Sequence, residues 1–244
     1  MSAGMRILVA SPLGHIVAEP IRAEIAGSTV VVASDESEFS RAVTGHVRFD
    51  VVAADLIWNR EEMEWTFDGL DVLDGLHRVN RLAPVLLATQ GHSMETDHLE
   101  EARLRKDVWG VVAKSDCFRP LLASINTVAL GQHLPERSCP SSRPPLYELF
   151  TGRRGVTAGR LAGAIAAGNA SDNATLAAVA KVSPNTANKV TSHYLGPLMR
   201  ERGEHDDALP LTQPSVYRWC GLHARYIVSW CRRHGHADVL RPLS

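Results

Sequence analysis

The sequence predicts a doubly wound α/β domain followed by a mostly α-helical domain, and three observations support this. Five short runs rich in Val, Leu and Ile alternate with helical segments between residues 5 and 130. The segment 131–145 is rich in Pro and Ser, and Ala-rich stretches without a comparable strand-like run follow it. We therefore expect an α/β domain over 1–130, a linker over 131–145 and a helical domain over 146–244.

Each apolar run has the composition of a strand buried on both faces of a parallel sheet. Helical segments between the runs give five βα units. The runs are RILVA, TVVVA, DVVAAD, PVLLAT and VWGVVA, and the helices are expected around 14–26, 36–44, 70–80, 96–104 and 120–129. Because such sheets bind ligands at the carboxyl ends of their strands, Ser11, Asp55, Thr89 and Lys114 are expected to converge there.

Charge is divided unevenly along the chain. Residues 1–140 hold 13 Lys and Arg against 20 Asp and Glu, a net charge of −7, whereas residues 141–244 hold 13 against 7, a net charge of +6. An acidic half joined to a basic half indicates that the basic half meets a polyanion. The alternative is that the charges cluster on solvated faces without such a role.

No export signal and no apolar run of membrane-spanning length is evident, so we expect a cytoplasmic protein without membrane contact. The four cysteines, Cys117, Cys139, Cys220 and Cys231, are scattered and suit reduced thiols. Enzyme motifs are also missing, since TGRRG is too short and lacks the lysine of a phosphate-binding loop and GHSME lacks the final Gly of a nucleophile elbow. We expect neither an enzyme nor a cofactor.

The order Asp55 after the third strand, Thr89 after the fourth and Lys114 after the fifth resembles the receiver domain of bacterial response regulators, over about residues 5–130. The resemblance implies that Asp55 accepts phosphate, that the Thr89 hydroxyl binds a phosphoryl oxygen and that Lys114 pairs with it. That family has two acids after the first strand to hold Mg²⁺, but this sequence reads LVASPLGH there, with Ser11 in that stretch. Phosphoryl transfer without the metal is expected to be slow or absent.

We therefore expect a degenerate receiver in which Asp55, Thr89, Lys114 and Ser11 form a vestigial phosphoacceptor site. The crevice instead binds a small molecule or a protein regulator, or its side chains merely pack. The loop after Asp55 is about half a dozen residues longer than the family pattern and carries aromatic residues among four acids, which is typical of a lid or docking surface. The alternative is that the aromatic residues pack against the sheet edge.

The segment SDNATLAAVAKVSPNTANKVTSHYL, residues 171–195, has the features of two short helices that meet at a turn near Val182. Ser171 or Asp172 can cap the first helix, and Ser183 followed by Pro184 is a strong start for the second. Leu176, Ala177, Ala180, Ala187, Val190, Tyr194 and Leu195 are expected to face inward. The side chains expected to contact DNA are Lys181, Ser183, Asn185, Thr186, Asn188, Lys189, Ser192 and His193.

This segment resembles the helix-turn-helix of LuxR/NarL-type output domains, which commonly follow a receiver. The resemblance implies a supporting helix at 158–168, a scaffold helix at 173–181 and a recognition helix at 183–195. Gly196-Pro197 is expected to end the recognition helix, which is a departure from the family. Nearby basic residues are expected to neutralise DNA phosphates, namely Arg153, Arg154, Arg160, Arg200 and Arg202.

The stretch 214–235 is expected to form one helix with an apolar stripe, which either forms a homodimer or packs on its own domain. Cys220-x-x-His223 and Cys231-x-x-His234 lie about 16 Å apart on a straight helix, so we expect no single zinc site. The leading hypothesis is a dimeric, phosphorylation-independent regulator that binds double-stranded DNA. A conventionally phosphorylated regulator and a protein-docking adaptor that never touches DNA remain alternatives.

Overall fold

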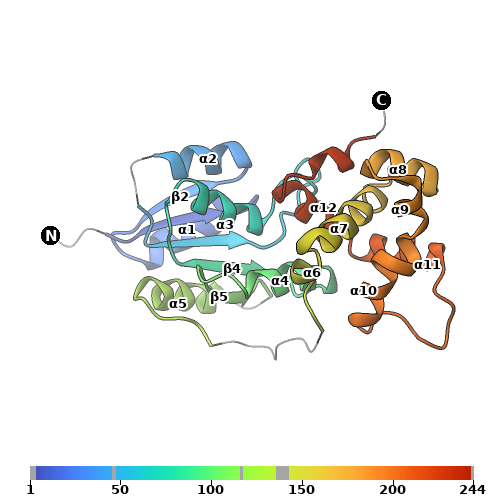
Figure 1. Ribbon diagram of the computed structural model, residues 1–244. Helices are drawn as coiled ribbons and strands as arrows, with labels where there is room; N and C mark the ends of the chain where they lie inside the picture. The colour runs from blue at the N-terminus through green and yellow to red at the C-terminus, as the bar shows by residue number, and fades with distance from the viewer. Residues whose placement is uncertain (1–3, 46–47, 116–117, 136–142, 243–244) are drawn as a thin grey trace. The chain divides into compact units, whose positions relative to one another are not determined.

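The computed structural model describes residues 4–45, 48–115, 118–135 and 143–242. It divides into two compact units, Met1–Cys139 and Pro140–Ser244 (Figure 1). The division lies within the segment 131–145, of which residues 136–142 lie outside the described residues, as do Cys117 and Cys139.

The first unit contains a parallel five-stranded sheet with the order β2-β1-β3-β4-β5, which confirms the doubly wound α/β prediction. The strands lie within one residue of the predicted runs. They are β1 (Arg6–Ala10), β2 (Thr29–Ala33), β3 (Val51–Asp55), β4 (Val85–Thr89) and β5 (Val108–Ala113). The strand order reverses between β1 and β3, which places a crevice at their carboxyl ends.

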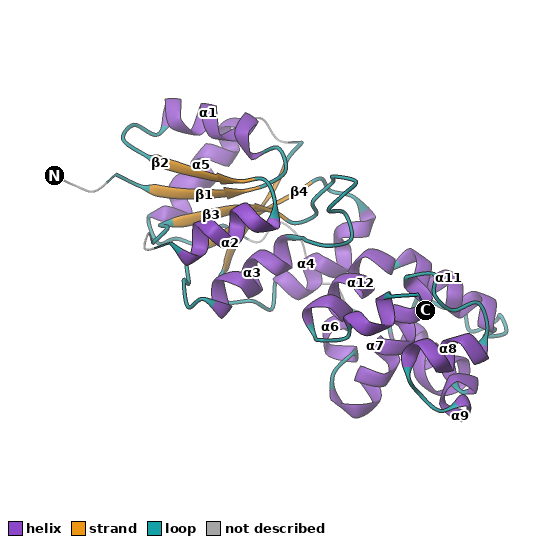
Figure 2. Cartoon of the chain, turned by 90° about the horizontal axis from the view of Figure 1, so that it is seen from above, coloured by secondary structure: helices purple, strands orange, loops and turns teal. Residues whose placement is uncertain are grey.

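Two layers of helices cover this sheet, with α1 and α5 on one side and α2, α3 and α4 on the other (Figure 2). Ile7, Val51 and Leu86 of the sheet pack with Ile21 and Ile125 in a core between the sheet and the α1–α5 layer. The helices are α1 (Gly14–Glu24), α2 (Glu36–Thr44), α3 (Gly69–Arg78), α4 (Thr96–Ala102) and α5 (Phe118–Ala129), each within two residues of its predicted bounds, and a short 3-10 turn, η1 (Ser93–Glu95), precedes α4.

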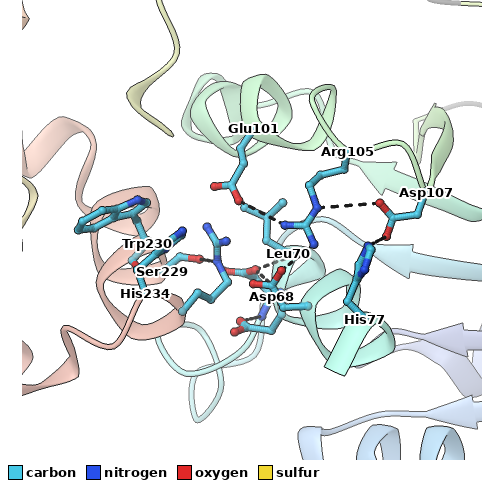
Figure 3. A network of polar contacts seen from close by, with 12 residues as sticks. Asp68, Leu70, His77, Glu101, Arg105, Asp107, Ser229, Trp230 and His234 are labelled. Carbon is cyan, nitrogen blue, oxygen red and sulfur yellow. Dashed lines mark hydrogen bonds and ion pairs between the residues drawn. The ribbon is translucent and has the colours of Figure 1, made fainter. Parts of the chain in front are cut away.

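A polar network ties α3, α4 and the start of β5 together (Figure 3). Arg105 lies 2.6 Å from Asp74 of α3 and 3.9 Å from both Glu101 of α4 and Asp107. His77 of α3 lies 3.1 Å from the other oxygen of Asp107. These ion pairs join α3, α4 and the residue before β5, and they lie on the side of the sheet opposite to α1 and α5.

The second unit is helical in the residues that the structure describes. Its elements are α6 (Leu146–Leu149), α7 (Gly152–Ala166), α8 (Asn173–Ala180), α9 (Pro184–Asn188), the π-helical turn η2 (Val190–Tyr194), α10 (Leu195–Glu201), α11 (Gln213–Leu222), α12 (Ala224–Arg233) and the 3-10 turn η3 (Ala237–Leu240). Helix α7 begins earlier than the predicted supporting helix 158–168 and packs against α12. An added Cβ at Gly159 would lie 2.5 Å from the Trp230 ring, so the glycine permits this close approach.

The prediction of a single helix over 214–235 is wrong, because the helix is interrupted at His223, between α11 and α12. The side chain of His223 lies 3.3 Å from Glu204, and the Trp219 indole N–H donates to the same carboxylate at 2.8 Å. The apolar stripe of these helices is buried. Cys220 and Cys231 are free thiols within it, and burial raises the pKa of both.

Within the described residues, no helix has the length and apolar character to cross a bilayer.

Candidate functional site

The first candidate site is the crevice at the carboxyl ends of β1, β3 and β5. Asp55, the last residue of β3, is only 6% exposed. One oxygen of its carboxylate, Oδ2, accepts a hydrogen bond from the Ser11 hydroxyl at 2.6 Å and lies 2.6 Å from the Lys114 ammonium. Ser11 in turn accepts a hydrogen bond from the Leu13 backbone N–H at 3.1 Å. Ser11 and Lys114 therefore converge on Asp55.

Thr89 does not join this cluster. It ends β4 and is buried, but its hydroxyl donates to the Val112 carbonyl of β5 at 3.3 Å. The Lys114 backbone N–H donates to the Thr89 carbonyl at 2.7 Å, so Thr89 connects the ends of β4 and β5. The strand order correctly places Thr89 at the carboxyl end of β4, but it does not determine which acceptor the Thr89 hydroxyl contacts.

Burial raises the pKa of the Asp55 carboxyl above its ordinary value. The charge of Lys114 and the hydrogen bonds from Lys114 and Ser11 act in the opposite direction, and the charge of Glu95 adds to the rise. Glu95 is a buried acid near the crevice whose role no sequence pattern indicates. Its carboxylate accepts hydrogen bonds from the backbone N–H groups of Gln90, Gly91 and His92 at 3.0, 2.7 and 3.0 Å.

These residues do not fit the magnesium ion that the receiver resemblance implies. Mg²⁺ takes near-octahedral oxygen ligands, usually with one or two carboxylates. The described partners of Asp55 are an ammonium and a hydroxyl, and both use the same carboxylate oxygen. Glu95 is already held by three amides, and the described part of the chain contains no cluster of three or more His, Cys, Asp or Glu that would hold a metal.

The aromatic loop after Asp55 packs into the first unit. Trp58 is fully buried and Phe67 is 5% exposed. Their rings meet edge to face with centroids 4.8 Å apart, and Phe67 also lies against Phe39 of α2 at 5.7 Å. Trp58 and Phe67 therefore pack inside the first unit and do not form an exposed docking surface, whereas the Trp65 side chain is 46% exposed.

The second candidate site is the surface formed by α8, α9 and η2. Asp172 caps α8 by accepting from the Ala174 and Thr175 backbone N–H groups. Ser183 caps α9 by accepting from the Thr186 N–H at 3.1 Å, and Pro184 is its first residue, which confirms the predicted start. Between the two helices Lys181 adopts the left-handed conformation, with φ 54°. The chain therefore turns sharply from α8 to α9.

Most of the residues predicted to contact DNA share the solvent face of this element. The predicted inward residues of α8 to α10 are buried, except for the half-buried Tyr194. On the other face, Thr186 is half-buried. Exposed residues are Lys181, Ser183, Asn185, Asn188, Lys189, Ser192 and His193.

Four of the residues predicted to contact DNA have side-chain partners within the second unit. The Ser183 hydroxyl caps α9 and lies 2.9 Å from the Thr186 hydroxyl. The Asn188 side-chain oxygen accepts from the Asn173 amide of α8 at 3.1 Å. The Lys181 ammonium lies 3.1 Å from Asp238, whose pKa is held below its ordinary value mainly by hydrogen bonds from Arg160. The exposed face thus carries both amide and ammonium groups, such as those of Asn185 and Lys189. Side chains of these kinds contact base edges and phosphates in DNA.

The predicted recognition helix over 183–195 is wrong as one regular helix. It consists of α9 and the π turn η2, and α10 then carries Gly196 and Pro197 in its first turn. Proline is tolerated there, but it supplies no N–H to the carbonyl four residues earlier, that of His193. Arg154 of α7 fills this place, because its guanidinium donates to the His193 carbonyl through Nε at 3.1 Å and through a second nitrogen.

Most of the arginines predicted to neutralise phosphates make other contacts. Arg160 donates to Asp238 and to the Ala180 carbonyl, and Arg200 lies 3.3 Å from Asp207. Arg202 is buried and pairs with Glu204 at 2.9 Å. Among the described residues, Arg153 alone of the five makes no ion pair or side-chain hydrogen bond, and it is exposed. The acidic partner of Arg160 lies 78 residues along the chain, whereas the acidic partners of Arg200 and Arg202 lie within seven residues of them.

No family model matches the chain, and no protein of curated function matches it. Several solved structures resemble it. A complex of the two-component response regulator RcsB with DNA is 14% identical with a TM-score of 0.48, over 91% of this chain and 98% of that one. RcsB of Salmonella typhimurium is 13% identical with a TM-score of 0.45, over 88% and 98%. The receiver domain of the Francisella response regulator 1452 is 21% identical with a TM-score of 0.41, over 52% and 98%.

Proposed function

We propose that this chain is a sequence-specific DNA-binding transcription regulator of the response-regulator type, active without phosphorylation of Asp55. The observation that carries the proposal is the solvent face of α9 and η2, where Asn185, Lys189 and His193 are exposed beside a buried inner face. An element of this size fits the major groove of B-form DNA, where amide side chains read adenine and lysine contacts guanine or phosphate.

The scaffold of this element supports a role in recognition. Ser183 and Pro184 fix where α9 begins, and Asp172 fixes where α8 begins. Arg154 holds the backbone of η2 from α7. The recognition side chains are therefore carried on an element whose two ends are anchored, which is what positioning against base edges requires.

Phosphorylation independence is supported by the chemistry around Asp55. The stretch after β1 supplies the Ser11 hydroxyl and no carboxylate, and Lys114 and Ser11 already share one oxygen of Asp55. Without a metal to stabilise the charge of the transferring phosphoryl group, the reaction loses its main electrostatic support. We propose that regulation comes instead from a ligand or a protein at the first unit.

A helix-turn-helix protein reads two half-sites about one helical turn apart when it is a symmetric dimer. We propose a homodimer that binds a palindromic site. The stripe of α11 and α12 does not supply its interface, because its apolar side chains are buried within the chain itself, namely Val216, Trp219, Ile227 and Trp230.

The first experiment is to mix the purified, untreated full-length protein with sheared genomic DNA of its host and to sequence the retained fragments. We expect a few fragments that share a palindromic site. On that site, Asn185→Ala is expected to cost about 1–3 kcal/mol and to relax specificity at one base. Lys189→Ala is expected to weaken all sites alike and to lower the salt slope by about 1.

Lys106→Ala is the matched control, because Lys106 is an exposed lysine of the first unit. It is expected to leave DNA binding unchanged. Binding that ignores Lys189→Ala and lacks a steep salt dependence contradicts DNA recognition and favours the protein-docking adaptor.

Phosphorylation is tested separately with acetyl phosphate and Mg²⁺. We expect no covalent labelling of the native chain and the same DNA affinity for Asp55→Asn as for native protein. Labelling that requires Mg²⁺ and disappears in Asp55→Asn establishes the conventionally phosphorylated regulator instead.

A further inference from the structure

A pocket of about 320 Å³ opens beside Asp55, between the sheet and the layer formed by α1 and α5. We propose that it binds an uncharged, largely apolar small molecule that carries a hydroxyl or carbonyl group at one end. Its volume lies in the range of small-molecule sites, which are typically apolar with a few placed polar groups. The inference concerns the first unit alone, so it stands whether or not the second unit binds DNA.

The walls of the pocket are apolar. Val9 and Val112 of the sheet form its floor together with the small side chains of Ala53 and Ala88. Alanines at this end of β3 and β4 leave room that larger side chains fill deeper in the same core, where Val51 and Leu86 lie. The pocket therefore follows from the sequence of the strand ends, and it faces the same layer as the core.

The rim of the pocket exposes large apolar side chains. Leu13 and Ile16, at the start of α1, line it and are 60% and 70% exposed. On the other side, Phe118 and Leu121 of α5 line it and are half-buried. Single exposed apolar residues are common on proteins, but here two exposed and two half-buried ones surround one opening. An apolar ligand would cover them.

The polar end of the pocket has unused hydrogen-bonding capacity. Lys114 and Ser11 both approach Oδ2 of Asp55, and among the described residues Oδ1 receives no hydrogen bond. The Lys114 ammonium carries three donors, and Asp55 is the described partner for one of them. A hydroxyl at this end can donate to Oδ1 of Asp55 and accept from Lys114, and a carbonyl can accept from Lys114.

Charge selects against ionic ligands. Among the described residues, the charged ones that line the pocket are Asp55 and Lys114, and at 2.6 Å they neutralise each other. An anionic ligand would meet the Asp55 carboxylate, and the Lys114 cation that a phosphate ester would need is already paired. A cationic ligand would compete with Lys114 for the same carboxylate. The pocket is therefore matched to a neutral molecule.

The test uses 2-naphthol, which is uncharged at pH 7, and its isostere 2-methylnaphthalene as probes in equilibrium dialysis against the full-length protein. We expect saturable binding of one 2-naphthol per chain. Ile16→Ser removes part of the apolar rim and is expected to weaken binding about fivefold or more. Leu130→Ser is the matched control, because Leu130 is 77% exposed and does not line the pocket, and its affinity is expected to equal that of the native chain.

Two further variants test the interior. Ala88→Leu fills the floor and is expected to abolish binding, with circular dichroism as the check on folding. Lys114→Met is expected to shift the ratio of the two dissociation constants toward 2-methylnaphthalene by about fivefold or more, because the ammonium donor is lost. The proposal is overturned if 2-naphthol does not saturate, if Leu130→Ser weakens binding as much as Ile16→Ser, or if Lys114→Met leaves the ratio unchanged.

Discussion

Replacement of Gly196 by alanine is expected to destabilise the second unit. Gly196 lies where the π turn η2 meets α10, and an added Cβ would lie 2.0 Å from the Thr191 carbonyl oxygen and 2.2 Å from a methyl carbon of Leu211. Leu211 can rotate away, but Thr191 offers a backbone atom. The backbone of η2 must therefore move to admit the methyl group.

The magnitude follows from two opposing effects. Alanine is favoured over glycine in a helix by about 1 kcal/mol. Overpacking costs about 1–3 kcal/mol, and contact with a backbone oxygen places Gly196→Ala at the upper end of that range. The expected net loss is about 2 kcal/mol, which corresponds to a fall in Tm of about 10 °C for a unit of this size.

Gly221→Ala is the matched control. Gly221 lies in the last turn of α11, is exposed, and would have nothing within 4 Å of an added Cβ. Gly221→Ala therefore gains only the helix preference of alanine over glycine, about 0.5–1 kcal/mol in the free energy of unfolding. Its Tm is expected to rise by a few degrees. Differential scanning calorimetry of the full-length variants measures both, and Gly221→Ala identifies the transition of the second unit. A Gly196→Ala variant that is as stable as Gly221→Ala refutes the reasoning.

Three further predictions concern single side chains. The pKa of Asp55 is raised, so its ionised carboxylate lowers the free energy of unfolding as pH rises above the ordinary pKa of 3.8. Asp55→Asn is therefore expected to stabilise the protein more at pH 7 than near pH 4, as measured by urea unfolding. Carboxyl carbon NMR titration checks the direction of the pKa itself. Arg154→Ala leaves the His193 carbonyl to water and is expected to cost about 1 kcal/mol in thermal unfolding, whereas Arg153→Ala, next to it and without a described partner, is expected to cost nothing measurable. Ser183→Ala removes the cap of α9 and is expected to cost about 1 kcal/mol, again by thermal unfolding.

The sheet and its helices could be predicted from the sequence because their signals are local. Runs of Val, Leu and Ile, separated by segments with helical periodicity, predict the bounds of β1 to β5 to within one residue. The caps at Asp172 and Ser183 are also local, since an oxygen side chain and the next few amides suffice. The position of Asp55, Ser11 and Lys114 at one edge follows from parallel strand order alone.

The finer geometry could not be predicted in this way. The prediction that Gly196-Pro197 ends the recognition helix is wrong, because α10 runs through both residues. The irregular turn η2 lies before them, because a proline in the first turn of α10 affects the carbonyl of the preceding turn. Two arginines that are expected to contact phosphates, Arg160 and Arg202, pair with Asp238 and Glu204. Asp238 lies 78 residues from Arg160, so no spacing rule identifies it.

The way the chain leaves the sheet has a consequence for self-association. β5 is an edge strand, yet the Leu134 backbone N–H donates to the Trp109 carbonyl at 2.8 Å, and the His133 ring stacks on Trp109 with centroids 4.3 Å apart. Gly110 admits this approach, since an added Cβ would lie 2.4 Å from Leu134. An exposed edge is a template for strand addition by another chain. Here a second copy would first have to displace Leu134, so Leu134 disfavours the addition of another strand at the β5 edge of the sheet.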